Sequence, residues 1–328
     1  MRVAVIGAGH NGLVAGLELA RAGVDVVVLE QDGQAGGCLW TERTASGVLV
    51  ERGAFEHGGV AGLAEDLGLA AFGLRYADHP LLAGTVFGDG EQRLFDVDLD
   101  RTVAALGPDA GSYRELAGLA GAVFGVLDGF GGVPPTLTQA AAALAGLRGG
   151  DALFRTLVQP AELVIASAVG DPHTRAALEL YAAHGQVPPW SPGSGMFGLL
   201  LPSMHGGRAV RPVGGSAMLT GALAAALSAA GGRLLVDTPV TGLRPAGRGA
   251  VVTVPGEQFS VDAVVAAVDV RRVAALVEDV PAALLGSIAD AHSGHFNVAE
   301  LTVSIVTGPL DAPGPLRADP DAVWFVQD

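Results

Sequence analysis

The chain is poor in cysteine and in aromatic residues. Its 328 residues include a single cysteine, Cys38, which excludes an intrachain disulfide and fits a reducing cytoplasm, the location we expect. Aromatic residues make up 5% of the chain, whereas half of all residues are hydrophobic and 16% are charged. We therefore expect a folded protein with a large core of small and aliphatic side chains, and not a disordered one.

Positive charge is also scarce. The chain has 19 basic and 34 acidic residues, a formal net charge of −15, and its longest basic cluster is the pair Arg271–Arg272. A surface that binds nucleic acid needs clustered basic side chains, because the affinity comes from neutralising phosphates and releasing counterions. The composition argues against nucleic acid as a partner.

The sequence shows neither a signal peptide nor a membrane-spanning helix. The apolar run that follows Arg2 is too short for the hydrophobic region of a signal peptide. The uncharged stretch from Leu180 to Gly207 contains four prolines and many glycines, so it cannot satisfy its own backbone hydrogen bonds as a spanning helix must. The apolar run Leu116–Leu127 is a candidate for peripheral membrane contact, but it is too short to span a bilayer, and core packing explains it better.

The first thirty residues have the pattern of a βαβ unit. Arg2–Ile6 and Val24–Leu29 are short β-branched runs typical of buried parallel strands. Between them, a glycine-rich turn leads into a helix predicted over Leu13–Ala22, which Gly23 ends.

The turn itself, Gly7-Ala8-Gly9-His10-Asn11-Gly12, is a G-x-G-x-x-G motif in the context that a dinucleotide site requires. Gly7 permits the tight turn, Gly9 lets the backbone approach a pyrophosphate, and Gly12 lets the helix pack closely on the strands. The helix N-terminus then presents free N–H groups to the phosphates. Glu30, at the end of the second strand, is placed to accept hydrogen bonds from a ribose diol and disfavours a 2′-phosphate. An ordinary glycine-rich turn is the weaker alternative, because strand, turn, helix, second strand and acid all agree.

The motif alone leaves FAD and NAD open, since both contain an ADP half. The segment Gln34-Ala35-Gly36-Gly37-Cys38 favours FAD. Its adjacent glycines allow a second close backbone approach, which a longer dinucleotide lying extended over the sheet would use.

The rest of the chain divides by pattern. Four Ala/Leu-rich helices are predicted between residues 76 and 205: Tyr113–Leu127, Gln139–Leu147, Asp151–Val169 and His173–His184. A helix over Ser216–Ala230 is then followed by strands over Leu234–Val236, Ala250–Val254 and Ala263–Val268. We assign 1–75 and 206–275 to an FAD-binding domain, 76–205 to a substrate or cap domain, and 276–328 to the start of a returning substrate-domain segment. The predicted fold class is α/β: a Rossmann-like FAD-binding domain of the glutathione reductase type with an inserted, mostly helical cap domain.

At this point the sequence resembles a known family. The run Val5–Leu13, together with Glu30 and Ala35-Gly36-Gly37, is similar to the FAD-dependent phytoene desaturase-related oxidoreductases, which are amine oxidase-like flavoproteins. The His-Asn pair within the glycine motif resembles the subgroup of pyridine nucleotide-disulfide oxidoreductase domain-containing protein 2. Further similarity lies in His205–Arg208, Val213–Gly215, Asp237–Val240 and Asp262–Asp269.

The resemblance implies an oxidoreductase of dehydrogenase or desaturase type that holds FAD and passes a hydride from a small apolar substrate to the flavin. It implies that the glycine motif meets the pyrophosphate, that Glu30 meets the adenosine ribose, and that Val240 contacts the adenine through its backbone. The predicted cofactor-binding residues are Gly7, Ala8, Gly9, His10, Asn11, Gly12, Glu30, Gln31, Gly36, Gly37, Cys38 and Val240.

Two departures from the family pattern matter. Relatives often have arginine after the glycine pair, where this chain has Cys38. Relatives also continue to a further glycine-rich strand–helix motif near the flavin ring, and nothing after residue 275 matches it. A non-catalytic or partner-dependent FAD-binding half-enzyme, completed by a partner chain, is therefore the alternative function, and an NAD-dependent dehydrogenase is a third.

No catalytic residue and no metal site are predicted. Cys38 is either a redox thiol or flavin attachment point or, more simply, a small residue packed beside the cofactor. His57 and His184 are acid/base candidates only because histidine titrates near neutrality. His292 and His295 are spaced like metal ligands, but no further ligand completes a site, so a surface pair is the better interpretation. Gly214-Gly-Ser216-Ala lacks the final glycine of a serine hydrolase elbow.

Overall fold

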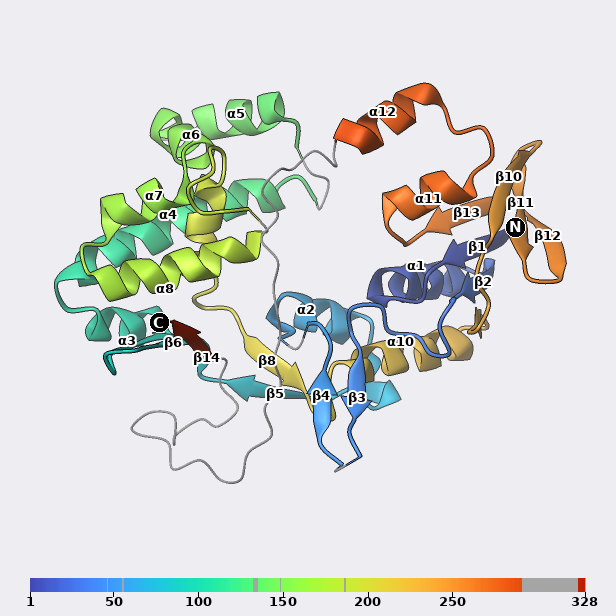
Figure 1. The fold of residues 1–328 in the computed structure, drawn as a ribbon, viewed down its shortest axis with the longest axis horizontal. Helices are drawn as coiled ribbons and strands as arrows, with labels where there is room; N and C mark the ends of the chain where they lie inside the picture. The colour runs from blue at the N-terminus through green and yellow to red at the C-terminus, as the bar shows by residue number, and fades with distance from the viewer. Residues whose placement is uncertain are drawn as a thin grey trace. The chain divides into compact units, whose positions relative to one another are not determined.

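The computed structural model describes residues 1–45, 47–54, 56–131, 135–147, 149–185, 187–290 and 324–327. These residues form two compact units (Figure 1). The first unit contains residues 1–77 and the described residues from 210 to 290. The second contains residues 78–209 together with the strand at 324–327. The predicted returning segment, 276–328, lies largely outside the described residues. Of its described parts, 276–290 belongs to the first unit and 324–327 to the second.

The first unit is built on a four-stranded sheet in the order β13-β1-β2-β9. The strands are β1 (Arg2–Ile6), β2 (Asp25–Leu29), β9 (Arg233–Leu235) and β13 (Ala263–Ala266). All three neighbouring pairs are parallel, so the carboxyl ends of these strands lie at one edge. The predicted α/β fold with a parallel sheet is confirmed.

Each face of this sheet is covered by a different layer. Side chains alternate along a strand, so Val3 and Val5 of β1 pack with Leu13 of α1 (His10–Arg21) and Leu223 of α10 (Ala217–Ala229) in one hydrophobic cluster. The intervening Ala4 and Ile6 pack on the other side against an antiparallel sheet of β10 (Gly242–Ala246), β11 (Gly249–Val254) and β12 (Glu257–Val261). Both faces of the parallel sheet are thus buried, as its aliphatic composition requires.

The remaining elements of the first unit are short. They are a hairpin of β3 (Thr41–Arg43) and β4 (Leu49–Glu51), the helices α2 (Gly58–Asp66), α11 (Val270–Leu276) and α12 (Ala282–Asp290), and a 3₁₀ turn η1 (Leu69–Phe72). The chain leaves the first unit within β5 (Tyr76–His79) and returns to it within β8 (Ala209–Pro212).

The second unit combines helices with a small sheet. Strand β6 (Leu81–Phe87) pairs antiparallel with β7 (Gln92–Asp96) and parallel with β14 (Trp324–Gln327). The helices are α3 (Leu99–Ala105), α4 (Ala110–Asp128), α5 (Leu137–Ala145), α6 (Gly150–Val158), α7 (Ala161–Ala168), α8 (Pro172–Ala182) and α9 (Leu200–Ser203), with 3₁₀ turns η2 (Gly107–Asp109), η3 (Ala183–Gly185) and η4 (Gly195–Leu199). Leu116, Ala120 and Val123 of α4 are buried in this unit's core, so the apolar run noted in the sequence packs inward.

One helix prediction is wrong. The segment Asp151–Val169 is not continuous but forms α6 and α7, which are separated at Gln159 and Pro160. Gln159 is extended, with φ −84° and ψ 168°. The cause is local, because proline lacks an N–H and disfavours the helical conformation of the residue before it.

Among the helices that the structure describes, none is long and apolar enough to cross a membrane.

Candidate cofactor site

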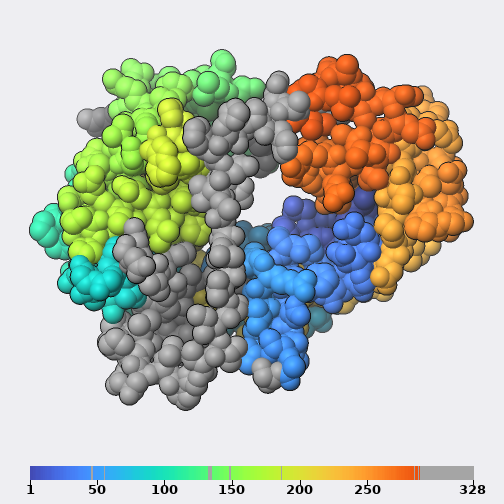
Figure 2. Space-filling view, viewed as in Figure 1, coloured from blue at the N-terminus to red at the C-terminus, as the bar shows by residue number. Residues whose placement is uncertain are grey.

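A pocket of about 400 Å³ opens in the first unit where β1, β2 and β13 end. Its walls are Ile6, Gly7, Gly9, Leu29, Glu30, Gln31, Asp32, Gly37, Val240, Ala267, Val268, Asp269, Arg272, Ala275 and Leu276. Figure 2 shows the N-terminal residues, in dark blue, next to the orange residues around α11 in this unit. The chain connects β1 through α1 to β2 on one side, whereas β13 pairs with β1 on the other. The crevice therefore lies where the strand order reverses, the usual binding place in an open α/β sheet.

Two glycines of the G-x-G-x-x-G motif are required by the chain itself. Gly7 has φ +95°, and a Cβ there would lie 2.7 Å from Val268 Cγ1 and 2.9 Å from the Ala267 carbonyl oxygen. A Cβ on Gly12 would overlap the Gly7 carbonyl oxygen. Gly7 thus makes the turn after β1 and Gly12 allows α1 to approach it, the roles that the sequence pattern predicts.

Gly9 is different. Its φ of −68° suits any residue, and a Cβ there would meet only Gly37 Cα, at 3.9 Å. Gly37 (φ +62°) lines the same pocket, and its neighbour Gly36 donates its N–H to the Ala8 carbonyl oxygen at 3.1 Å. The two glycine segments therefore lie against each other beside the pocket, and the space at Gly9 is not needed by the protein.

Helix α1 begins at this loop without a side-chain cap. Gly9 is its N-cap residue, no side chain bonds the first N–H groups, and the first turn has no acidic residue. The N-terminal N–H groups of a helix need partners and attract anions. A diphosphate supplies such partners, so this end of the pocket fits the central part of FAD.

Glu30 ties the second strand to the glycine loop. Its carboxylate is buried and accepts hydrogen bonds from the Ala8 N–H at 2.7 Å and the Asp32 N–H at 3.0 Å. The Thr238 N–H in turn donates to the Glu30 carbonyl oxygen at 2.7 Å. A carboxylate has about four acceptor positions, so the Glu30 oxygens retain capacity for ribose hydroxyls.

Residues 12–304 match the family of flavin containing amine oxidoreductases. The chain belongs to this family. A flavin-containing family implies FAD as the cofactor, which decides between the two dinucleotides that the glycine motif left open.

The relatives of this flavin amine oxidoreductase include two curated proteins. One subunit of the limonene dehydrogenase of Castellaniella defragrans is 37% identical over 119 residues, which are 35% of this chain and 22% of the relative. Tryptophan 2-monooxygenase of Rhizobium rhizogenes is 50% identical over 56 residues, which are 16% of this chain and 8% of the relative. The chain thus spans less than a quarter of either curated relative.

Solved structures share the fold. An oxidoreductase from Methanosarcina mazei aligns with a TM-score of 0.62 at 16% identity over 88% of this chain and 65% of its own. Putrescine oxidase bound to putrescine aligns with a TM-score of 0.60 at 18% identity over 88% of this chain and 63% of its own. A fatty acid isomerase from P. acnes aligns with a TM-score of 0.55 at 15% identity over 88% and 63%. At such identities the likeness concerns the fold alone.

The structure divides the predicted site residues of this flavin oxidoreductase into two groups. Those that line the pocket are Gly7, Gly9, Glu30, Gln31, Gly37 and Val240. Those that do not are Ala8, His10, Asn11, Gly12, Gly36 and Cys38. Of the second group, Ala8, Gly12 and Gly36 are buried within the loop, whereas Cys38 is exposed, with its Sγ 3.9 Å from His10 Nδ1.

The sequence interpretation missed one wall of the pocket. This wall consists of Ala267, Val268, Asp269, Arg272, Ala275 and Leu276, after β13, and Asp32 was missed beside Glu30. A signal was present, because a strand over Ala263–Val268 was predicted in a parallel sheet. Residues that follow such a strand lie at the same edge as those that follow β1.

The two histidines weighed as acid/base groups have different surroundings. His57 is buried, its Nδ1 lies 3.4 Å from the Tyr76 hydroxyl, and its Nε2 has no hydrogen-bond partner among the described residues. Burial, with a smaller contribution from the charge of His10, lowers the pKa of His57 to about 4. His184 is in the second unit, where its Nδ1 lies 3.1 Å from the Tyr181 carbonyl oxygen. His292 and His295 lie outside the described residues.

Within the described ranges, no group of three or more His, Cys, Asp or Glu side chains is arranged to hold a metal ion.

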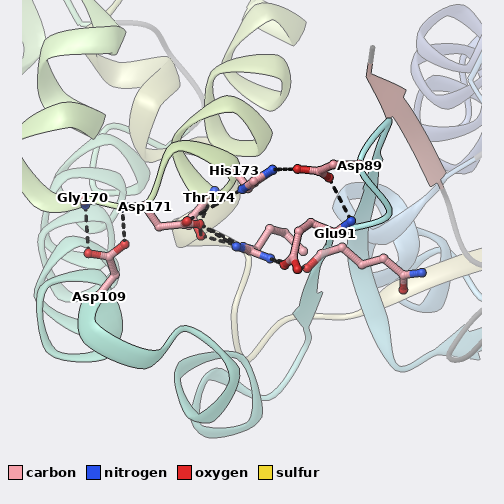
Figure 3. A network of polar contacts seen from close by, with 9 residues as sticks. Asp89, Glu91, Asp109, Gly170, Asp171, His173 and Thr174 are labelled. Carbon is pink, nitrogen blue, oxygen red and sulfur yellow. Dashed lines mark hydrogen bonds and ion pairs between the residues drawn. The ribbon is translucent and has the colours of Figure 1, made fainter.

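The second unit contains a polar network of its own (Figure 3). Asp109 accepts the N–H groups of Gly170 and Asp171, both at 2.8 Å. Asp171 caps α8 by accepting the Thr174 N–H at 2.8 Å, and it pairs with Arg93 at 2.9 Å. Burial raises the pKa of Asp171, but the hydrogen bonds from Thr174 and Arg93 outweigh it and lower the pKa to about 2. Because these charges satisfy one another, the network holds β7 to α8.

Proposed function

We propose that this chain holds FAD in the pocket of the first unit and acts in a dehydrogenase or desaturase that oxidises a small apolar molecule. The observation that carries the proposal is the uncapped start of α1 at the glycine loop, beside a pocket at the carboxyl edge of the parallel sheet. A helix N-terminus at this place suits an anionic dinucleotide, and membership of a flavin-containing family identifies that dinucleotide.

Each end of the pocket is assigned to a part of FAD. The loop of Gly7, Gly9, Asn11 and Gly12 would present backbone N–H groups to the diphosphate, with the segment Gly36–Gly37 running beside it. The opposite end has a different chemistry. Glu30 would accept the ribose hydroxyls, Gln31 would lie beside them, and the Val240 backbone would contact the adenine.

The bound flavin supplies the redox chemistry by accepting a hydride from a C–H bond of the substrate. The role of this chain is to bind and orient the dinucleotide through the groups just named. An apolar substrate is supported by the resemblance to phytoene desaturase-related enzymes and by the relative named for limonene, a hydrocarbon. The same resemblance supports the second unit, residues 78–209, as the substrate or cap domain, and a cytoplasmic location accords with the single cysteine.

One observation favours the second candidate, a partner-dependent half-enzyme. The relative at 37% identity is named as one subunit of its dehydrogenase. In this alternative the chain binds FAD, but turnover needs a partner chain that completes the flavin surroundings.

The first experiment is the visible absorption spectrum of the purified chain, with the released cofactor identified by mass. A flavin spectrum and the mass of FAD are expected. For protein purified without cofactor, added FAD should raise the melting temperature, because a ligand at 100 times its Kd stabilises the native state by about 2.7 kcal/mol. NADP is the matched control and should give no shift. A colourless protein that FAD does not stabilise contradicts the proposal.

The second experiment separates the two candidate functions. The FAD-loaded chain is incubated with a limonene-type hydrocarbon and a dye that accepts electrons, first alone and then with cell extract. Dye reduction by the chain alone supports the dehydrogenase. Reduction only after addition of extract supports the partner-dependent half-enzyme, and no reduction in either case contradicts an apolar hydrocarbon substrate.

A further inference from the structure

Of the four charged residues that line the cofactor pocket, three are acidic. Glu30, Asp32 and Asp269 contribute carboxylates, and Arg272 is the only basic residue among the lining residues. The chain contains no lysine, so arginine is its only side chain with a permanent positive charge. A dinucleotide diphosphate brings two negative charges to this pocket. A cationic side chain at the pocket would offset their repulsion with the carboxylates, in addition to the N–H groups at the start of α1.

The neighbouring arginine does not serve this purpose. Arg271 donates from Nε to Asp269 Oδ1 at 2.7 Å and from Nη2 to Asp269 Oδ2 at 2.6 Å, and its backbone N–H donates to Oδ1 at 2.8 Å. Arg271 therefore neutralises Asp269, which caps α11. No ion pair joins Arg272 to a carboxylate of the described residues, so its charge stays available to the pocket.

The position of Arg272 favours the diphosphate end of the pocket. Its backbone N–H donates to the Asp269 carbonyl oxygen at 2.9 Å, within one turn of the end of β13. Val268, one residue before Asp269, packs closely on Gly7. A Cβ added to Gly7 would lie 2.7 Å from Val268 Cγ1. Arg272 thus belongs to the wall beside the glycine loop, whereas Val240 belongs to the β9–β10 connection.

We infer that the Arg272 guanidinium binds the diphosphate of the cofactor and supplies the positive charge that the acidic pocket otherwise lacks. The inference rests on the proposed FAD site and deepens it. A guanidinium is suited to this task because its planar set of N–H donors matches two phosphate oxygens.

The test is the Kd of FAD for the full chain and for three variants, Arg272→Gln, Arg272→Lys and Arg248→Gln, at low and at high salt. Arg248 is an exposed arginine of the same unit outside the pocket, so Arg248→Gln makes the same change in net charge. Two unit charges about 4 Å apart in water interact by about 1 kcal/mol. Arg272→Gln should accordingly weaken FAD binding about fivefold to tenfold at low salt, and less at high salt, where the charge is screened.

Two controls complete the expected pattern. Arg272→Lys should recover part of the affinity, and Arg248→Gln should bind FAD as the unsubstituted chain does. Melting curves without FAD check that every variant is folded.

Three results overturn the inference alone: unchanged affinity of Arg272→Gln, an equal loss for Arg248→Gln, or a loss that salt does not alter. Failure of the unsubstituted chain to bind FAD is a distinct result, because it removes the proposed function together with the inference.

Discussion

Replacement of Gly9 by alanine should leave the fold intact and weaken the binding of FAD. A Cβ at Gly9 meets only Gly37 Cα, at 3.9 Å, and the φ of −68° is ordinary for alanine. The folded chain should therefore accept Gly9→Ala without strain. Alanine has less freedom than glycine in the unfolded chain, which stabilises the folded chain by about 0.4–1 kcal/mol, but alanine is also a poorer N-cap residue than glycine. Because the two effects oppose each other, the free energy of unfolding should change by less than about 1 kcal/mol.

The expected effect of Gly9→Ala on FAD is the opposite. Gly9 lines the pocket at the start of α1, where the diphosphate would approach the backbone. An added methyl group in a closely packed contact costs about 1–3 kcal/mol. This corresponds to a Kd about 5-fold to 150-fold higher.

Two measurements on the same samples give the answer: denaturant unfolding without FAD, and an FAD titration followed by flavin fluorescence. The control is Gly221→Ala in α10, where a Cβ meets nothing within 4 Å and the residue is exposed. It should stabilise the chain by about 0.5–1 kcal/mol and leave FAD binding unchanged. The reasoning is refuted if Gly9→Ala binds FAD like the unsubstituted chain, or if it unfolds more easily than that chain by more than about 1 kcal/mol.

Three further predictions concern charge. Glu30→Gln places an amide where the Ala8 and Asp32 N–H groups need two acceptor oxygens. Denaturant unfolding should therefore show a loss of about 1–3 kcal/mol in the free energy of unfolding. An unchanged midpoint would contradict the role of this carboxylate. His57 has a folded pKa of about 4, so its contribution should reduce stability by up to about 3 kcal/mol as the pH falls from 6.5 to 4. His57→Gln should flatten the unfolding free energy in that window, and an unaltered slope there would count against the burial. Asp171 has a folded pKa of about 2, so its contribution of about 2 kcal/mol is present above pH 4 and is lost as the pH falls to 2. Asp171→Asn should lower stability at neutral pH and remove that acid-dependent part, which a pH series of melting curves would show.

The glycine loop was predictable because its reasons are local. Gly7 needs a positive φ and Gly12 needs close packing within a few residues of the chain, so spacing alone carries the information. The acid at Glu30 was equally visible, but its bond to the Ala8 N–H was not. That bond depends on the parallel register of β1 and β2, which places Ile6 beside Leu29. The register is a contact between strands, so no local sequence pattern reveals it.

The missed wall of the pocket depends on distant parts of the sequence. Val3 pairs with Ala263, so the residues that follow β13 join a site whose other lining residues are Val240 and residues within the first forty. Local patterns do not contain the strand order of a sheet. Arg272 therefore appeared in the sequence only as half of a short basic pair.

In the second unit, the sequence predicted helices but missed strands. Its Ala/Leu-rich segments predicted helices, and α4, α5 and α8 are present near the predicted positions. The hairpin of β6 and β7 was not predicted, because the run Leu81–Phe87 lacks the alternation of polar and apolar residues that marks a strand exposed on one face. Ala83 and Thr85 within it are buried, so the sheet and not the local pattern determines its conformation.

The pairing of β1 with β13 also sets an order of events during synthesis. Residues 78–209 of the second unit have left the ribosome at a stage when β1 still lacks one neighbour. That neighbour, Ala263–Ala266, and the pocket wall after it emerge only afterwards. The parallel sheet of the first unit is thus completed after residues 78–209 have been made, and the nascent chain carries an unpaired edge on β1 until then. Chains released before about residue 263 should expose that edge and aggregate, whereas those that end after α11 should not.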